Sequence, residues 1–585
     1  MRTVLSILLI AICFSLAACE SSVNFDATAN VSAQYSSVFV TVKEVWVNES
    51  ATATPDDTTW LKFPLSKPVT FDLVGLNSGA LSDFASQLAI TTGTYRQMRL
   101  ILVDRSEALT DSAKSVSATY NDQVTWFDAS GTQGTLPLEI PNSAQGIGIE
   151  MELVVPAPTE AILAALASTS SSSSSTDSTS STTSTIPTTT TTTSTTALSS
   201  DSTTSTVTAT SRVMFDAARD LTAFRFSDRP GFLLNPTLSA RDQDDVGTIQ
   251  GQLDLSLLTI NTGTGRPDIE VTAEALNDDS TRRIEIGSAP VSATGTFTLY
   301  PLPLIDGKRD STTYDLVIHG PGVRTIVIRS VPVTKGTPDD GADVALGTIT
   351  LTAADSYAVN VDAGSVVATR GARVAFYQTL PDDNAPYLIE QRPVDPLSGQ
   401  FANDGLLSGA STIVFGTFGS SIAFTAAAPQ EGASKYSVST LSPLFEAGDF
   451  SLTLLAPPAA TTSTATFTVP DVSLPSGAAS GTIAATVSVG TQGKYDKGAL
   501  LVTHNGAVVT AASLDQAITT GAASTIVNAT NVPASSSAGF DRGLYYLEAW
   551  AWNSADPAGT FSRQPVTGAV DLRATLTANA NVTLN

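Results

Sequence analysis

Three acidic clusters hold the side chains best suited to binding a metal ion. They comprise Asp242, Asp244 and Asp245; Asp339, Asp340 and Asp343; and Asp382, Asp383 and Asn384. Calcium takes about six to eight oxygen ligands, and closely spaced loop carboxylates can supply several of them. No cluster has the spacing of an EF-hand. Two interpretations therefore stay open: calcium bound at either of the first two clusters, or solvated turn residues. No other cofactor is expected.

An aromatic row near the C-terminus could bind sugar. Trp550 and Trp552 are two residues apart and would share one face of a strand, and Tyr546 has the same parity. Such a row can stack against a sugar ring or fill the core of a β-sandwich. A glycan ligand at these three residues is thus one hypothesis, and a packing role is the other.

The supply of nucleophiles and zinc ligands is small. The only cysteines are Cys13 and Cys19, and the only histidines are His319 and His504. The histidines read as strand-end residues, and His504 precedes Asn505-Gly506, a hairpin-turn pair. No Gly-x-Ser-x-Gly motif is present, and a His-rich zinc site cannot be built. We therefore expect no enzymatic activity.

A lysine, a carboxyl group and an asparagine could form an intramolecular isopeptide bond. The residue types occur together near the C-terminus, as Lys494 or Lys497, Glu548, and Asn579 or Asn581. Residue types alone do not indicate whether they meet in the fold.

The N-terminus has the pattern of an export signal. Met1-Arg2 is followed by an apolar run, Val4 to Leu16, and by Leu16-Ala17-Ala18-Cys19. This pattern describes a signal peptide over residues 1–18, and the run is too short for a membrane span of about 20 residues. The last four residues resemble the lipobox of bacterial lipoproteins. The resemblance implies cleavage before Cys19, a diacylglyceryl and palmitate-type lipid on Cys19, and attachment to a membrane. The absence of Asp after Cys19 favours the outer membrane, on its periplasmic or its cell-surface side.

The charge of the chain excludes one class of partner. The formal net charge is −25 and the pI is near 4.3. Such a field repels nucleic acid. We expect an envelope protein or a glycan as partner, and no nucleic acid.

Short apolar runs between turn residues predict an all-β protein of tandem β-sandwich domains. Clear runs are Ser37 to Val47, Tyr95 to Val103 and Leu544 to Trp552. Helices are expected at Leu76 to Leu88 and at Thr159 to Ala167. A Ser/Thr-rich stretch at about 168–210 cannot bury enough apolar area to order itself, and is expected as a disordered insertion.

The segment from 19 to 245, without that insertion, resembles the bacterial lipoprotein family of domain of unknown function 4382. The resemblance rests on Val38 to Val47, Trp60 to Phe63, Phe71 to Leu76, Gly93 to Leu100, Val213 to Asp216 and Leu233 to Pro236, in this order. The resemblance implies a fold and a location in the cell as a bacterial lipoprotein, but it implies no enzymatic reaction.

Three further β-sandwiches are expected at 246–350, 351–470 and 471–585. Gly247 to Gly251, Gly295 to Leu299 and Tyr314 to Ile318 resemble carboxypeptidase regulatory-like, transthyretin-like modules. The segment 351–470 resembles a degenerate copy. The expected function is that of a membrane-anchored, non-enzymatic binding, adhesion or scaffolding protein of the cell envelope. The alternative is a carbohydrate-binding accessory protein for polysaccharide handling.

Overall fold

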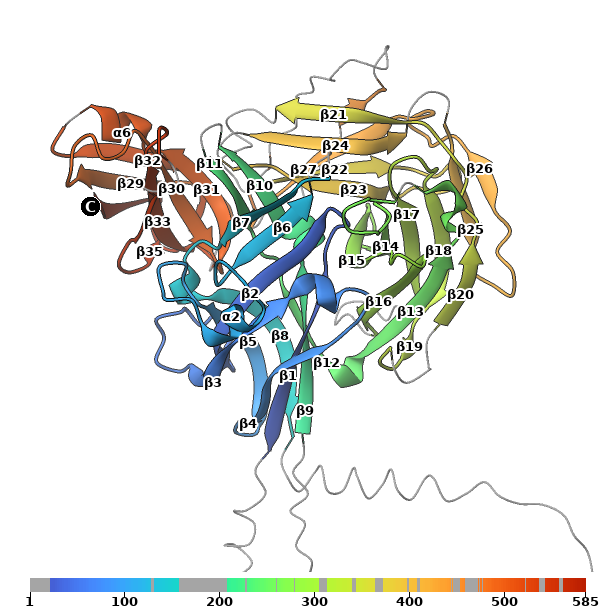
Figure 1. Ribbon diagram of the computed structural model, residues 1–585, viewed down its shortest axis with the longest axis horizontal. Coiled ribbons are helices and arrows are strands. Elements are labelled where there is room, and N and C mark those ends of the chain that lie inside the picture. The colour runs from blue at the N-terminus through green and yellow to red at the C-terminus, as the bar shows by residue number, and fades with distance from the viewer. Residues whose placement is uncertain are drawn as a thin grey trace, which may run out of the picture.

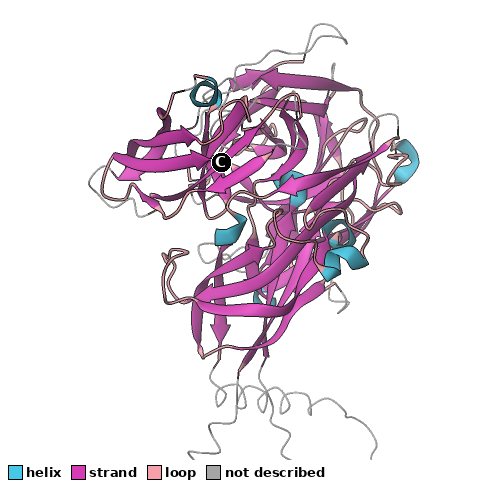
Figure 2. Cartoon of the chain, turned by 60° about the vertical axis from the view of Figure 1, so that its left-hand side comes forward, coloured by secondary structure: helices cyan, strands magenta, loops and turns pink. Residues whose placement is uncertain are grey.

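A computed structural model describes the chain from residue 21 to residue 585, with gaps. The gaps are residues 128–130, 157–207, 227–228, 259, 278, 305–312, 339–343, 363–371, 397–398, 408–410, 443, 446–452, 458–471, 473, 476, 521, 536–541 and 557–560. The described residues form strands joined by turns, with a few helices of one turn (Figure 2). The predicted all-β class with tandem sandwiches is confirmed. We keep the predicted boundaries as names for four modules: 21–245, 246–350, 351–470 and 471–585.

The first module is a sandwich of two sheets. Its elements are β1 (Ser22–Asn30), β2 (Tyr35–Asn48), β3 (Leu61–Asp72), η2 (Leu73–Leu76), β4 (Ser82–Ala89), β5 (Gly93–Leu102), α2 (Asp111–Ser115), β6 (Gln123–Phe127), β7 (Gln133–Glu139), η3 (Ser143–Gln145), β8 (Ile147–Val155), β9 (Thr208–Asp216), α4 (Ala217–Asp220), β10 (Leu221–Phe226), β11 (Arg229–Leu234), β12 (Ser239–Asp242) and η4 (Gln243–Asp245). One sheet has the order β12-β9-β1-β4. The other has the order β10-β11-β7-β6-β2-β5-β8, with β3 beside β2. One hydrophobic core fills the space between them, and it contains residues from β8 and from β9. The strands on either side of residues 157–207 therefore pack into the same sandwich.

The helix expected at Leu76 to Leu88 is wrong. Ser82–Ala89 forms β4, which pairs antiparallel with β1. Phe84 is the reason, because its ring packs against Phe25 and Phe71 in the core. Tertiary packing of one aromatic side chain thus outweighs a local helical pattern. The helix expected at Thr159 to Ala167 and the Ser/Thr-rich insertion lie outside the described residues.

The second and third modules share a sheet. The second contains β13 (Val246–Leu253), η5 (Leu255–Leu257), β14 (Glu270–Leu276), β15 (Arg283–Pro290), β16 (Thr296–Pro303), β17 (Thr313–His319), β18 (Ile326–Pro332), β19 (Thr334–Lys335) and β20 (Val344–Ile349). The third contains β21 (Ser356–Asp362), β22 (Arg373–Gln378), β23 (Tyr387–Pro393), β24 (Gln400–Leu407), β25 (Ile413–Thr417), β26 (Thr425–Ala427), β27 (Tyr436–Leu441) and β28 (Thr453–Leu455). Strand β25 pairs in parallel with β18, so the sheet β15-β14-β17-β18-β25-β26 crosses the boundary predicted at 350/351.

The fourth module is a separate sandwich with its own core. It contains β29 (Ala478–Val489), β30 (Lys497–His504), β31 (Ala507–Ser513), α6 (Asp515–Thr519), β32 (Thr525–Ser535), β33 (Leu544–Trp552), β34 (Ser562–Pro565), β35 (Val570–Asp571) and β36 (Thr577–Leu584). Figure 1 shows β1, β4 and β9 ending at the bottom of the molecule, with the third module at the top and the fourth at the upper left. None of the helices in the described part of the chain has the length and apolar character needed to cross a membrane.

Candidate functional site

The aromatic row is buried, which corrects the hypothesis of an exposed sugar platform. Tyr546, Trp550 and Trp552 lie on one face of β33 and are 5 %, 0 % and 4 % exposed. This face turns away from the core of the fourth module and packs against the first. There the two tryptophans join Leu233 of β11 and Val508 of β31 in one apolar cluster. A sugar cannot stack on rings that a neighbouring module already covers.

The described residues do not include a set of side chains that could bind calcium. In the part of the chain that the structure describes, no group of three or more His, Cys, Asp or Glu side chains is placed to hold a metal ion. Asp242 instead caps η4 by accepting from the amide of Asp244, and Asp244 pairs with Lys335 at 3.0 Å. Asp339, Asp340 and Asp343 lie outside the described residues.

The third acidic cluster has a different use. Asp383 lies 2.8 Å from Nη2 of Arg283, and Asp382 accepts from both terminal nitrogens of Arg329. Both arginines belong to the second module. This acidic turn of the third module therefore pairs with the arginines of its neighbour.

The residues considered for an isopeptide bond do not meet. Lys494 donates to the carbonyl of Asn585 and Lys497 pairs with Asp515, while Glu548 pairs with Arg563. Asn579 and Asn581 lie on the exposed side of β36. Strand alternation places these groups on different faces.

Both histidines end strands, as predicted, and both belong to module interfaces. His319 ends β17, and its Nε2 lies 3.1 Å from Oε2 of Glu390 in the third module. His504 ends β30, next to the two-residue turn Asn505-Gly506, where both residues have positive φ. Burial lowers the pKa of His504 to about 4, so its ring is neutral at pH 7.

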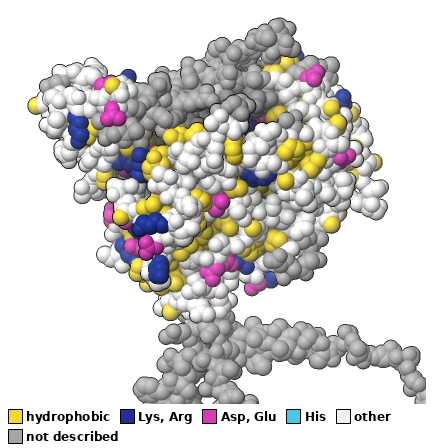
Figure 3. Space-filling view, viewed as in Figure 1, with side chains coloured by type: hydrophobic (Ala, Val, Ile, Leu, Met, Phe, Trp, Pro, Cys, Tyr) yellow, Lys and Arg dark blue, Asp and Glu magenta, His cyan; other side chains and the backbone are white. Residues whose placement is uncertain are grey.

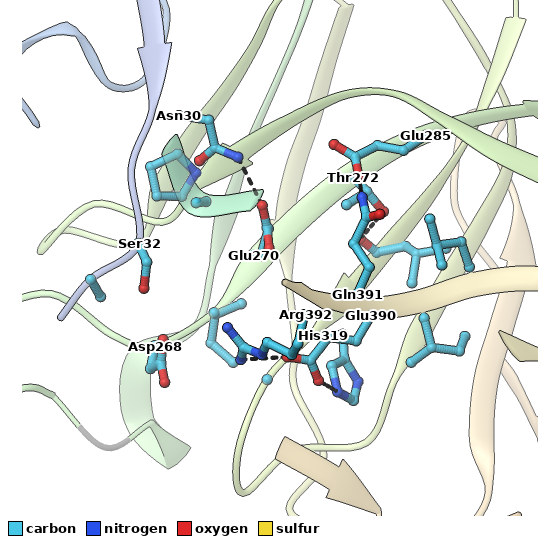
Figure 4. A pocket seen from close by; sticks show the side chains of 18 of the residues that line it. Asn30, Ser32, Asp268, Glu270, Thr272, Glu285, His319, Glu390, Gln391 and Arg392 are labelled. Atoms are coloured by element: carbon cyan, nitrogen blue, oxygen red, sulfur yellow. Dashed lines mark hydrogen bonds and ion pairs between the residues drawn. The ribbon is translucent and has the colours of Figure 1, made fainter. Parts of the chain in front are cut away.

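The first three modules meet around a small polar cavity of about 50 Å³ (Figure 4). Asn30 comes from the end of β1, Glu270 and Glu285 from β14 and β15, and Glu390 from β23. The amide of Asn30 donates to Oε1 of Glu270 at 2.8 Å. The cavity is thus a junction at which polar groups from three modules converge.

A buried ion-pair network, which we call the acidic junction, adjoins the cavity and shares Glu270 and Glu285 with it. It consists of Asp216, Asp220, Glu270, Glu285, Arg219 and Arg373. Arg219 lies 3.2 Å from both Asp216 and Glu285, and Arg373 pairs with Asp220. The network joins the first module to the second through Arg219, and to the third through Arg373.

The acidic junction raises the pKa of Glu270 and of Asp216 above their usual values. Burial, with Glu285 and Asp216 nearby, raises the pKa of Glu270 to about 8. The pKa of Asp216 is raised to about 6, mainly by burial. The neighbouring Glu285 adds to this rise, and the positive charge of Arg219 opposes it. Perturbed carboxyl groups occur at catalytic sites and in structural ion-pair networks alike. Here both carboxyl groups accept a hydrogen bond from a neighbouring module, Glu270 from Asn30 and Asp216 from Ser288, which favours the structural role.

A second network joins the first module to the fourth. Arg563 of β34 donates from Nε to Oε1 of Glu548 at 2.9 Å and from Nη2 to the carbonyl of Ile140 at 2.7 Å. Its Nη1 lies 3.4 Å from Oε2 of Glu139. Burial alone would lower the pKa of Arg563, but the carboxylates of Glu548 and Glu139 raise it above its usual value. A charged arginine thus holds two buried carboxylates from two modules.

Sequence reasoning missed these interface charges, although one signal was present. Glu548 interrupts an otherwise apolar strand on the same parity as Tyr546 and Trp550. A charged residue inside an apolar run requires a partner, because an unpaired buried charge is costly. That partner, Arg563, could not be identified without the pairing of β33 with β34.

Residues 20–201 match the model of the family described as Domain of unknown function (DUF4382). The match lies where the resemblance was predicted and covers less than half of the chain. The later resemblances, at Val213 to Asp216 and Leu233 to Pro236, fall beyond it and stay predictions. A search of curated proteins finds no match to this chain.

Among solved structures, the streptococcal ancillary pilin is 10 % identical, with 57 % of this chain and 98 % of that chain covered and a TM-score of 0.13. The major pilin of Corynebacterium diphtheriae is 12 % identical, with 58 % and 99 % covered and a TM-score of 0.11. A 9R-lipoxygenase from Cyanothece is 22 % identical, with 18 % of this chain and only 17 % of that chain covered and a TM-score of 0.12. TM-scores this low carry no argument about function.

Proposed function

We propose that this protein is a lipid-anchored, non-enzymatic scaffolding or binding protein of the bacterial outer membrane, held there through Cys19. The lipobox-like sequence Leu16-Ala17-Ala18-Cys19 is its basis in the sequence. A transthyretin-like origin of the later modules belongs to the same proposal, since such modules commonly serve as spacers.

The structural support for the proposal is the position of Ser21 and Ser22, which closely follow Cys19 and lie at one end of a body whose modules are joined by buried charges. Ser21 donates to the carbonyl of Pro156 at 2.9 Å, and Ser22 lies 3.1 Å from Thr208. Lipid on Cys19 would therefore bring the base formed by β1, β4 and β9 to the membrane. The third and fourth modules lie at the other end in Figure 1.

The module interfaces are suited to a rigid body. A flexible string of domains would have exposed polar linkers between modules. Instead, Arg563, the acidic junction and the paired strands β18 and β25 connect the four modules. Charge on the face shown in Figure 3 occurs in small separate groups, which does not favour nucleic acid as a partner on that face.

Fractionation of cell envelopes tests the proposal. The unchanged protein should sediment with outer membranes, and Cys19→Ala should leave the membrane fraction. Cys13→Ala is the matched control, because it removes the other cysteine and should sediment like the unchanged protein. A Cys19→Ala protein that stays in the outer membrane, or an unchanged protein that is never there, would refute it.

A further inference from the structure

A hollow of about 380 Å³ lies between the first and fourth modules. Its walls come from the loop at residues 51–55, from β5 and β8, and from the fourth module at His504-Asn505 and near β33. The volume falls in the range of small-molecule sites, which is about 300–1,000 Å³. Two modules form it, as is common for binding sites.

The hollow contains a buried arginine that forms no ion pair with a carboxylate among the described residues. Arg99 is 3 % exposed, and its terminal nitrogens donate to the carbonyls of Gln145 and Gly146 and to Oδ1 of Asn505. All three acceptors are neutral. No described carboxylate lies within ion-pair distance of Arg99, although Asp56 is near enough to raise its pKa, and its Nε has no acceptor among the described residues. Burial lowers its pKa to about 10, so it carries its charge at pH 7.

Three more arginines line the hollow, and one of them, Arg573, pairs with Asp571. The other two come from opposite modules. Arg96 of β5 and Arg542 before β33 are exposed, and neither side chain has an ion pair or hydrogen bond within the described ranges. Three arginines without an ion pair among the described residues thus line one hollow of a molecule whose formal net charge is −25. Guanidinium groups bind carboxylates and other oxyanions through paired hydrogen bonds.

The remaining polar groups limit the ligand further. Glu150 and Glu152 line the hollow from the exposed face of β8. Their carboxylates accept hydrogen bonds from hydroxyl groups and repel a ligand with two or more adjacent negative charges. The chemistry therefore calls for one carboxylate on a molecule rich in hydroxyls.

We propose that this hollow binds an acidic saccharide, with the carboxylate of a hexuronic acid residue held by Arg96 and Arg542 and attracted by the buried charge of Arg99. The hydroxyls of the sugar face Glu150 and Glu152. This site goes beyond the proposed anchoring function and does not depend on lipid at Cys19, so each can fail without the other.

Calorimetric titration of the purified full-length protein tests the site. Galacturonate, which carries one carboxylate, should bind, and galactose, its neutral counterpart, should not. Arg96→Gln and Arg542→Gln should each weaken binding about tenfold, the effect of losing one charge-assisted hydrogen bond. Arg324→Gln in the second module is the matched control and should bind unchanged, since its described partner is the hydroxyl of Thr412.

The two variants replace exposed arginines, so a loss of binding cannot be ascribed to unfolding, as it could for the buried Arg99. Near-ultraviolet circular dichroism should show native spectra for the Arg96 and Arg542 variants. Absence of binding, equal affinity for the neutral sugar, unchanged affinity in both variants, or tighter binding of inorganic phosphate than of galacturonate would each overturn the proposal.

Discussion

Arg99 of the first module donates a hydrogen bond of 2.8 Å from Nη2 to Oδ1 of Asn505 in the fourth module. Asn505 is the first turn residue of the hairpin between β30 and β31, and its carbonyl also accepts from the amide of Gly148. Gly506 follows with φ of +91°, so the turn has two positive φ values, as two-residue hairpins of type I′ require. One tight turn therefore brings a distant part of the chain onto β5 and β8.

Gly148→Val should separate this hairpin from the first module. A Cβ atom at Gly148 would lie 2.7 Å from Oδ1 and 2.9 Å from Cβ of Asn505, so the turn would have to move. We expect a loss of about 1–3 kcal/mol in the free energy of unfolding, measured in guanidinium chloride. Gly75→Ala is the control, because its nearest atom would be 4.0 Å away, and it should change stability little. Equal stabilities for both variants would argue against close contact at this turn.

Arg563→Gln should destabilise the interface between the first and fourth modules. It would leave the buried carboxylate of Glu548 without its cation and remove one cation from Glu139. Breaking a buried pair from one side costs about 3–5 kcal/mol. The comparison is Arg573→Gln, which breaks an exposed pair with Asp571 and should cost at most about 1 kcal/mol. Chemical unfolding of both variants checks this, and similar losses would contradict it.

The acidic junction should make stability fall as pH rises. The pKa of Glu270 is raised from 4.5 to about 8, so the folded protein keeps a proton that the unfolded chain releases between these values. Rising pH then favours unfolding, by up to about 1.4 kcal/mol for each pH unit within this window. The raised pKa of Asp216 acts in the same direction, from 3.8 to about 6.

Glu270→Gln should remove most of this slope and raise the melting temperature at pH 8. The amide oxygen of Gln can still accept from Asn30, while the cost of the buried charge disappears. Thermal unfolding from pH 4.5 to 9 measures the effect. Asp111→Asn, at an exposed carboxylate, is the control and should keep the slope of the unchanged protein. A slope that persists in Glu270→Gln would show that other groups cause it.

The sequence predicted strands well where apolar and polar residues alternate regularly. It predicted the wrong secondary structure where packing across the sandwich determines it. Leu544–Trp552 is the predicted strand to the residue, and Gly93–Leu102 differs from its prediction only at the ends. Ser82–Ala89 reads as a helix locally, and only the contact of Phe84 with Phe25 and Phe71 makes it a strand. Local pattern cannot report a contact between distant residues.

The candidate sites were harder to predict than the strands, because they also depend on contacts between residues that are distant in the sequence. Shared parity of Tyr546, Trp550 and Trp552 could be read from the sequence, but not that the first module covers that face. The arginines of the hollow come from β5 and from the segment before β33, and nothing local marks them as neighbours. Sites between modules depend on docking, which local spacing does not encode.

Amide hydrogen exchange tests most directly whether the modules form one body. Among the residues that the structure describes, three amides donate across the interface of the first and fourth modules: Asn142 to Glu548, Gly148 to the carbonyl of Asn505, and Val508 to Asn235. If the interface is permanent, these amides should exchange as slowly as those in the ladder between β29 and β32. Exchange at the rate of exposed loops, with the β29–β32 ladder still protected, would show that the modules separate and would contradict the rigid scaffold.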